Sequence, residues 1–315
     1  MRPFDITIAG EINLDLILYG LAEQMPVERE LLADDFRLTL GSSSAILAHN
    51  LAALGMNVGF ITKVGTDPLG TIALQRLQAA GVDFSSILTA DGLQTGVTIL
   101  LHHGITRHIL TYPGVMADMS CGELNFEYLA SSRHFHISSL FLQKSLQPGL
   151  PALCRQLKER GVTLSLDTND DPDDVWGEPL QEMLGLVDVL LPNEDEAMRM
   201  THTADVESAA ASLAQRVPVV AVKCGSRGSL VRTGQEQWSI PSVAITPIDT
   251  IGAGDSFNAG FLQGYVRGLP LPACAEQGNV AAALSTLRPG GTESFRDATL
   301  LHTFLAEHPT ALHVR

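Results

Sequence analysis

The sequence has few charged residues, and those it has are mostly acidic. Asp, Glu, Lys and Arg make up 17% of the 315 residues, with 20 basic side chains against 35 acidic ones and a formal net charge of −15. A nucleic-acid partner is therefore not expected, because a phosphate backbone is bound by a basic surface. A small anionic ligand is compatible with this charge, since backbone N–H groups, a helix N-terminus and Mg²⁺ can hold phosphates.

Cysteines and long apolar runs are also scarce. The four cysteines are far apart and form no Cys-x-x-Cys pair, so neither disulfides nor a structural zinc site is expected. No apolar stretch reaches the roughly 18 residues that a membrane-spanning helix needs. The first residues lack the pattern of a cleavable signal peptide. We therefore expect a cytoplasmic protein without a membrane partner.

Hydrophobic residues are abundant, at 45%, and they occur in short segments of two kinds. Compact apolar runs predict buried strands at 5–10, 58–65, 134–140, 162–168, 187–193 and 217–225. Longer segments with helical spacing predict helices at 44–55, 67–81, 148–161, 255–268 and 271–288. This alternation predicts an α/β fold with three layers, in which a mostly parallel sheet has helices on both faces.

Two segments differ from this pattern. Residues 96–114 read as two strands around a turn at His103-Gly104, and together with residues 12–40 they predict a small β-sheet lid outside the main body. We expect residues 1–315 to form one large domain that carries this lid. Arg107, in the lid, is a candidate to bind a substrate hydroxyl or carboxylate, and a plain surface arginine is the alternative.

The heptapeptide 249–255, Asp-Thr-Ile-Gly-Ala-Gly-Asp, stands at the start of a predicted helix. The small residues Gly252, Ala253 and Gly254 let backbone N–H groups converge on an anion, and the helix dipole adds positive charge there. No Gly-Lys-Ser/Thr follows, so this is not a Walker A loop. Asp255 lies beside the anion site, where it could accept the proton of an attacking hydroxyl. For an isolated Gly-x-Gly-Asp, an ordinary helix cap is the alternative.

Other polar residues follow predicted strands. In parallel sheets, ligands bind at the carboxyl ends of the strands, and Asp167, Asn169 and Lys223 lie at such ends. A turn-forming or edge-facing role is the alternative for each. Asn193 and Glu196 also follow a strand and are three residues apart on a helix start, so they share one face. This spacing favours a common role toward water or Mg²⁺, although acidic residues also suit a helix N-terminus.

These motifs, in this order, closely resemble those of the ribokinase-like (PfkB) carbohydrate kinases, whose second signature is Asp-Thr-x-Gly-Ala-Gly-Asp. Segments 10–17, 41–55, 191–197 and 223–231 extend the resemblance over nearly the whole chain. The resemblance implies ATP-dependent phosphorylation of a hydroxyl on a sugar or a sugar-like molecule, with Mg²⁺ as cofactor. It also suggests a homodimer that forms through the lid.

The resemblance implies a role for each matching position. Asp255 would be the base, and Gly252, Ala253 and Gly254 would form the anion hole. The residues expected at the sugar are Asn13, Asp15, Gly41, Ser42, Ser43, Arg107, Asp167 and Asn169. The residues expected along the nucleotide are Asn193, Lys223, Gly225, Gly228, Thr250, Gly252, Gly254 and Asn279. Glu196 would act on Mg²⁺ through water, and Asp249 would bind a monovalent cation such as K⁺.

Two positions depart from the family pattern in the first glycine signature. Ser42 stands where a second Gly is usual, and Ile46 replaces an Asn that typically bonds substrate hydroxyls. The departures imply a more apolar sugar pocket, or one that uses Ser43, Ser44, His49 or Asn50 instead. Two alternatives therefore stay open: a nucleoside (adenosine-type) kinase, and a non-catalytic ligand-binding protein that has kept the fold.

Overall fold

The computed structural model describes residues 2–103 and 106–310, so the predicted turn at His103-Gly104 falls partly outside the described residues. The main body is built on an eight-stranded sheet in the order β14-β13-β12-β11-β10-β9-β1-β4. All neighbouring strands from β12 to β4 pair parallel, whereas β13 pairs antiparallel with both β12 and the edge strand β14. Their bounds are β1 (Phe4–Ala9), β4 (Val58–Ile61), β9 (Ser132–Ser138), β10 (Thr163–Asp167), β11 (Val189–Leu190), β12 (Val219–Lys223), β13 (Ser229–Arg232) and β14 (Gln237–Ile240).

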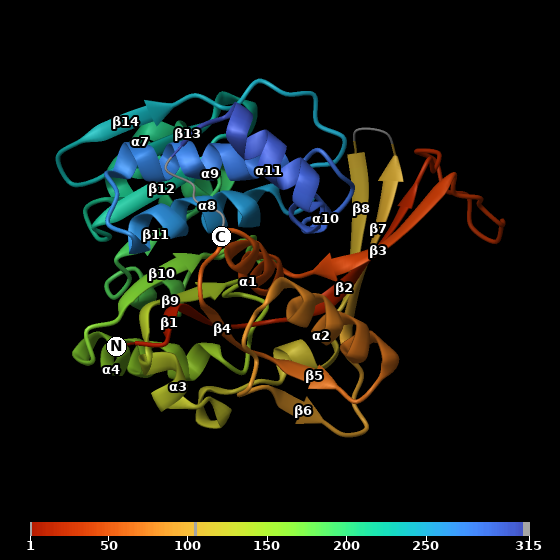
Figure 1. Cartoon of the computed structure of the whole chain (residues 1–315), viewed down its shortest axis with the longest axis horizontal. Coiled ribbons are helices and arrows are strands. Elements are labelled where there is room, and N and C mark those ends of the chain that lie inside the picture. The colour runs from red at the N-terminus through yellow and green to blue at the C-terminus, as the bar shows by residue number, and fades with distance from the viewer. Residues whose placement is uncertain (1, 104–105, 311–315) are drawn as a thin grey trace.

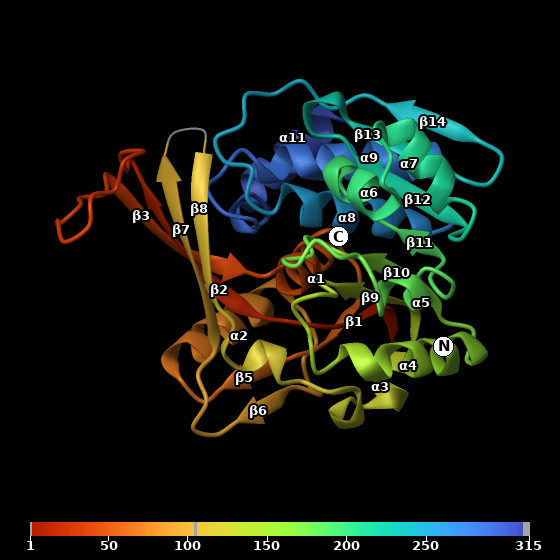
Figure 2. The same ribbon diagram turned by 180° about the vertical axis from the view of Figure 1, so that it is seen from behind.

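Helices cover both faces of the sheet (Figures 1 and 2), and each face has its own hydrophobic core. One layer consists of α1 (Ser43–Ala53), α2 (Pro68–Ala80), α8 (Ala253–Val266), α9 (Leu271–Ser285), α10 (Glu293–Arg296) and α11 (Ala298–Glu307). The other consists of α3 (Phe126–Ala130), α4 (Leu150–Glu159), α5 (Leu180–Met183), α6 (Glu194–Thr201) and α7 (Val206–Leu213). The predicted three-layer α/β fold is confirmed. In the described parts of the chain, no helix combines the length and apolar character needed to cross a membrane.

A second sheet projects from the main body in the order β3-β2-β7-β8 (Figure 1). It consists of β2 (Asn13–Tyr19), β3 (Asp35–Gly41), β7 (Gly96–His103) and β8 (Thr106–Tyr112). These strands coincide with the segments 12–40 and 96–114 predicted to form a lid, except that β3 extends one residue further, to Gly41. Successive side chains of a strand point to opposite faces. Asn13, Asp15 and Thr98 are thereby buried together on the face toward the main body.

The prediction of one strand over 58–65 is wrong. The run divides at Thr62 into β4, which belongs to the main sheet, and β5 (Lys63–Gly65), which pairs with β6 (Leu88–Ala90). The neighbour of β4 is β1, and their pairing ends at Ala9 and Ile61. Because buried backbone groups need partners, the chain continues beside another strand, and Leu88 N donates to Thr62 O.

Candidate active site

The start of α8 forms a compact turn that presents backbone N–H groups. Gly252 is the N-cap with φ +72°, and the helix begins at Ala253, two residues earlier than predicted. A Cβ on Gly252 would lie 2.5 Å from the Cα of Gly291, so this position requires glycine. Gly254 and Asp255 lie in the first helical turn, where N–H groups have no helical carbonyl partner. The turn can therefore receive an anion.

Asp255 lies in this turn and is surrounded by ionisable groups. Desolvation by the surrounding protein, and then the charge of Asp167, raise the pKa of Asp255 to about 7, against the lowering effects of Lys223 and a hydrogen bond with Ser43. A carboxyl group with a pKa near neutrality can exchange a proton with a substrate at neutral pH. The geometry and the pKa both suit a general base.

Lys223 and Asp167 form a buried ion pair behind Asp255. The Lys223 Nζ to Asp167 Oδ2 distance is 2.6 Å, and Asn258 donates its amide to the same oxygen. Asn169 N donates to the other oxygen, at 3.3 Å. Burial acts to lower the pKa of Lys223, but Asp167 and Glu196 outweigh it, so the pKa is raised and the ammonium is retained. Both oxygens of Asp167 thus accept protein donors, and one of them links Lys223 to Asn258.

A cavity of about 530 Å³ opens beside the N-terminus of α8. It brings together most of the residues that the sequence places along a nucleotide: Lys223, Gly225, Gly228, Thr250, Gly254 and Asn279. Val243, Ile245 and Phe257 give it apolar walls, as a planar base requires. Asn279 donates to the carbonyls of Ile240 and Pro241, so its amide also fixes the segment that follows β14.

Asn193 and Glu196 are occupied with each other at the start of α6. Glu196 N donates to Asn193 Oδ1 at 2.9 Å, and Asn193 N donates to Glu196 Oε2 at 2.9 Å, which is a capping box. Burial and then the charge of Asp167 raise the pKa of Glu196 to about 7. Within residues 2–103 and 106–310, no group of three or more His, Cys, Asp or Glu is arranged to hold a metal ion. The described part of the chain therefore offers no preformed cluster of carboxylates for Mg²⁺.

Three of the residues predicted to face the sugar, Asn13, Asp15 and Gly41, meet where β2 and β3 join the main body. A Cβ on Gly41 would lie 2.1 Å from Asp15 Oδ1 and 2.3 Å from Asn13 Oδ1, so the three residues are in direct contact. Asn13 donates to Thr98 Oγ1 at 2.7 Å, and its own Oδ1 is buried without a partner in the described residues. Burial and then the charges of Asp255 and Asp249 raise the pKa of Asp15 to about 7.

Ser42 has a positive φ, a backbone conformation that favours glycine. Its φ is +66°, and its hydroxyl donates to Glu11 O at 2.7 Å and accepts from Ala45 N at 3.3 Å. These two hydrogen bonds offset part of the strain of a positive φ. Ser43, the next residue, accepts the amide of Asn169 at 2.6 Å and bonds Asp255.

The other side chains suggested as substitutes for the missing Asn point elsewhere. Ser44 donates to Glu11, and Asn50 donates to Ser256 and to the carbonyl of Gly291. His49 is buried and hydrogen-bonded to Asn50, and burial lowers its pKa to about 4. Ile46 packs on the turn at Gly252 and Gly291 and thus supports the anion site. Of these candidates, Ser43 is the one beside Asp255.

Sequence reasoning missed several residues of the site. Glu11 is buried, its carboxylate accepts from Ser44 and Ser139, and burial raises its pKa. An acidic residue directly after a buried strand was a usable signal. Asn258 and Tyr19 gave none, since each lies within an ordinary helix or strand pattern.

Asp249 joins the lid to the turn before α8. Its carboxylate accepts from Tyr19 Oη at 2.9 Å, from Gly290 N at 3.0 Å and from Ile251 N at 3.0 Å. Arg107 of β8 reaches Thr250 Oγ1 at 3.4 Å. Two predicted site residues, Asp249 and Thr250, are thus in contact with lid strands.

Comparison with known proteins shows the family of the chain. The sequence model of the pfkB family carbohydrate kinases matches residues 4–298. The chain belongs to this family. Its curated relatives include fructoselysine 6-kinase of Shigella flexneri, 32% identical over 243 residues that cover 77% of this chain and 88% of the relative. Cytidine kinase of Thermococcus kodakarensis is 30% identical over 280 residues, which cover 87% and 93%.

Among solved structures, Arabidopsis thaliana ribokinase complexed with ribose and ATP superimposes with a TM-score of 0.81, covering 97% of this chain and 99% of the ribokinase. This superposition, at 23% sequence identity, shows that the two proteins share a fold. As a member of the pfkB family, the protein is a phosphotransferase that acts on a hydroxyl group, and ATP with Mg²⁺ is the expected phosphoryl donor.

Proposed function

We propose that the protein transfers the γ-phosphoryl group of ATP to a hydroxyl of a sugar or sugar-like acceptor, with Asp255 as the base. The observation that carries this proposal is the position of Asp255. It lies in the anion-binding turn of α8, between the cavity lined by Lys223 and Gly254 and the acceptor residues Ser43 and Asp15.

In the proposed reaction, a carboxylate oxygen of Asp255 takes the proton of the attacking hydroxyl. The hydroxyl oxygen then forms a bond to the γ-phosphorus while the bond to the β–γ bridging oxygen breaks, and ADP leaves. The N–H groups at the start of α8 stabilise the charge on the transferred group, aided by the helix dipole. Lys223, held by Asp167, adds a fixed positive charge next to Gly254.

Mg²⁺ would be carried into the site with the nucleotide, because Asn193 and Glu196 are already hydrogen-bonded to each other and no carboxylate cluster awaits it in the described residues. When bound, the ion neutralises charge on the phosphates. A K⁺ site at Asp249 would have to share that carboxylate with the donors from Tyr19, Gly290 and Ile251.

The test is turnover of ATP against a panel of sugars, sugar acids and nucleosides, with wild type and Asp255→Asn. We expect Asp255→Asn to lower kcat by roughly 10³-fold or more while ATP affinity changes little, because the variant removes the proton acceptor and leaves the N–H groups in place. Unchanged turnover in Asp255→Asn would exclude it as the base. Binding without phosphorylation of any acceptor would favour the non-catalytic alternative.

A nucleoside acceptor is the second candidate. One relative is named a cytidine kinase, and cytidine is a sugar that carries a base. Another is named a fructoselysine 6-kinase, and that name also describes a sugar that carries a substituent. The same panel decides between a free sugar and a substituted one.

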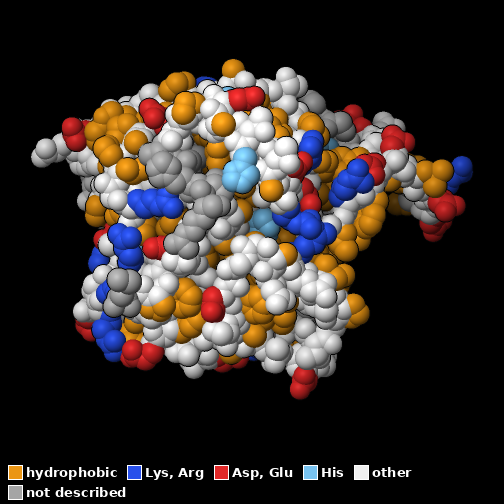
Figure 3. Space-filling model, in the orientation of Figure 1, with side chains coloured by type: hydrophobic (Ala, Val, Ile, Leu, Met, Phe, Trp, Pro, Cys, Tyr) orange, Lys and Arg blue, Asp and Glu red, His pale blue; other side chains and the backbone are white. Residues whose placement is uncertain are grey.

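We further propose a homodimer formed through the lid. Its outer face exposes the apolar side chains Phe36, Ile99 and Leu110, and Ile99 pairs directly with Leu110 across β7 and β8. Hydrophobic side chains are visible on the projecting lid in Figure 3. Light scattering of wild type and of Ile99→Glu/Leu110→Glu tests this, since the charged variant should be monomeric if this face is the interface.

A further inference from the structure

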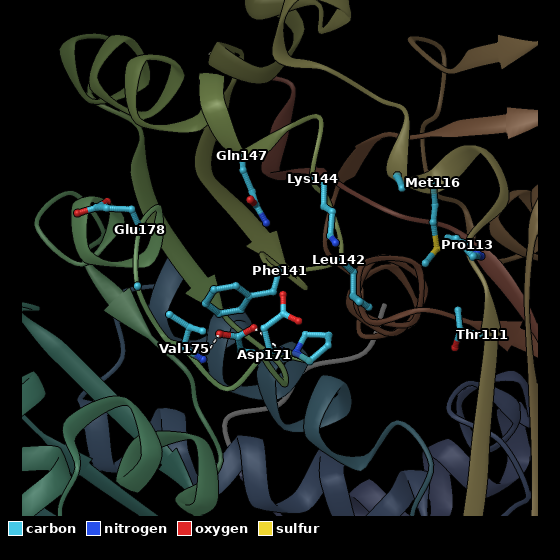
Figure 4. A pocket seen from close by; sticks show the side chains of 14 residues that line it. Thr111, Pro113, Met116, Phe141, Leu142, Lys144, Gln147, Asp171, Val175 and Glu178 are labelled. Carbon is cyan, nitrogen blue, oxygen red and sulfur yellow. Dashed lines mark hydrogen bonds between the residues drawn. The ribbon is translucent and has the colours of Figure 1, made fainter.

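A cavity of about 660 Å³ lies outside the nucleotide site (Figure 4). Its walls come from the end of the lid strand β8 and the short 3-10 helix after it (Gly114–Ala117), from the loop after β9 and from the loop after β10. The residues that matter for its chemistry are Thr111, Met116, Phe141, Leu142, Lys144 and Val175.

This cavity adjoins the acceptor residues on two sides. From the lid, Asn13 donates to Thr98 Oγ1 at 2.7 Å, and Thr98 Oγ1 lies 3.1 Å from the hydroxyl of Thr111, which lines the cavity. From the main body, Asn169 donates to Ser139 at 2.6 Å. Each cavity loop continues from one of these acceptor-side residues: Phe141 follows Ser139 by two positions, and Asp171 follows Asn169 by two. A group attached to the acceptor can therefore extend into this space.

The walls are largely apolar. Leu142 and Val175 expose 38% and 69% of their surface, and Phe141 presents a ring that contacts Trp176 edge-on, with centroids 5.5 Å apart. Exposed apolar side chains that gather around a concavity mark a place where a ligand is covered.

One cation points into this apolar space. The Lys144 side chain extends into the cavity between Phe141 and Met116 (Figure 4). The other three lysines pair with acidic side chains, in Lys63–Glu123, Lys158–Asp188 and Lys223–Asp167, whereas Lys144 has no such partner within the described residues.

Three carboxylates line the cavity together with Lys144, and none forms an ion pair with it in the described residues. Asp171 accepts from the backbone N–H groups of Asp173, Val175 and Trp176, at 2.8 to 3.1 Å. Glu178 points away from the cavity in Figure 4. Asp173, at the rim, is exposed, so water screens its charge. The amine of Lys144 is thus available to a ligand.

We propose that this cavity holds an apolar substituent of the acceptor that ends in an anionic group, a carboxylate or a phosphate, bound by Lys144. The proposal rests on the proposed function for the acceptor site beside it. It identifies the acceptor as a sugar with an anionic side arm.

The first experiment measures ligand binding in the cavity without catalysis, by NMR of protein labelled at the methionine methyl groups. The signal of Met116, assigned with Met116→Leu, is followed during titration with hexanoate, hexyl phosphate and hexanol. We expect one or both anions to shift the signal and hexanol to shift it far less. Lys144→Gln should abolish the difference, and the matched surface variant Lys158→Gln should keep it.

A response to hexanoate alone assigns a carboxylate, and a response to hexyl phosphate alone assigns a phosphate. Equal shifts with hexanol, or anion shifts that persist in Lys144→Gln, would overturn the proposal.

Turnover then tests the substrate. The probes are 1-deoxy-1-(hexylamino)fructose and its equal-length analogue 1-deoxy-1-(5-carboxypentylamino)fructose. We expect kcat/KM to favour the carboxylate by about tenfold in wild type and in Lys158→Gln, and the preference to vanish in Lys144→Gln, as expected for loss of one charge-assisted contact.

If both probes are phosphorylated with equal kcat/KM, the proposal fails and the kinase assignment stands. If Met116 responds through Lys144 but no acceptor of the wider panel is phosphorylated, the kinase assignment fails and the anion site stands.

Discussion

The ammonium of Lys223 lies 2.6 Å from a carboxylate oxygen of Asp167, and this pair connects the strands β12 and β10 directly behind Asp255. Lys223 lowers the pKa of Asp255, whereas Asp167 raises it. The pair therefore holds a positive and a negative charge close to the proposed base. The pKa of Asp255 depends on the difference between their two effects.

The first prediction concerns removal of Lys223. Lys223→Met leaves Asp167 buried without its counterion, which should lower the free energy of unfolding by roughly 3 kcal/mol. The double variant Lys223→Met/Asp167→Asn should recover much of this loss, because no buried charge then lacks a partner. Urea denaturation of the three proteins measures both effects. Equal stability of the single and double variants would contradict the prediction.

The pH dependence of turnover follows from Asp255. Its pKa is raised from 3.8 to about 7, and a base must be deprotonated to act, so kcat/KM should rise as pH increases through about 7. Because Lys223 lowers this pKa, the rising limb should move to higher pH in Lys223→Met. A pH profile from 5 to 9 measures the limb, and a limb near 4 would show that the carboxyl is not desolvated during turnover.

Burial of the Asp255 carboxylate should also lower the free energy of unfolding at alkaline pH. A carboxyl whose folded pKa is raised binds a proton more tightly in the native state, so its contribution to stability falls as pH rises from about 4 to 7 and stays low above 7. The amide in Asp255→Asn does not ionise, so the variant does not show this loss of stability as pH rises. It should therefore be more stable than wild type at pH 8, by about 1–2 kcal/mol after solvent screening, with no advantage at pH 4. Thermal unfolding at both pH values checks this, and a variant less stable at pH 8 would contradict it.

The two glycines of the turn should respond differently to alanine. Gly252→Ala should unfold more easily, by roughly 2 kcal/mol or more, because φ is +72° and the new Cβ meets Gly291 at 2.5 Å. In Gly254→Ala the Cβ has ordinary contacts, 3.6 Å from Lys223 Nζ, but projects into the nucleotide cavity. We expect a melting temperature close to wild type with a clear loss of ATP affinity. Loss of stability in Gly254→Ala equal to that in Gly252→Ala would refute the distinction.

Ser42 allows strain and capping to be separated. Ser42→Ala keeps the positive φ and loses both hydroxyl bonds, which should destabilise by about 1 kcal/mol. Ser42→Gly loses the same bonds but relieves the strain of the backbone, so it should be near neutral. Chemical denaturation of the pair decides, and if Ser42→Gly proves as unstable as Ser42→Ala, strain has no part in the effect.

Features of the fold that depend on one short segment of sequence could be predicted from that segment alone. The order of strands and helices follows from runs such as 5–10 and 67–81, and the turn at Gly252 follows from three small residues before an apolar helical face. The division of 58–65 into two strands could not be predicted, because it depends on the point at which the pairing with β1, a strand distant in sequence, ends.

For the candidate site, motif residues such as Asp255 and Lys223 could be predicted from their position after strands or before a helix, and the structure places them close together. Glu11, Asn258 and Tyr19 were missed because their importance arises from contacts made over long sequence separations. Tyr19, for example, bonds Asp249, which is 230 positions away. Likewise, the mutual capping of Asn193 and Glu196 satisfies groups whose spacing alone could equally indicate a shared Mg²⁺ ligand set.

The bond between Tyr19 and Asp249 has a consequence for the timing of the reaction. Asp249 also accepts the N–H groups of Ile251 and Gly290, so one carboxylate links the lid to the backbone that leads into the phosphate-binding turn. We infer that a movement of the lid would be transmitted through this carboxylate to the turn proposed to receive the phosphoryl group. An enzyme built in this way can delay assembly of its transfer geometry until an acceptor is enclosed, which protects ATP from wasteful reaction with water.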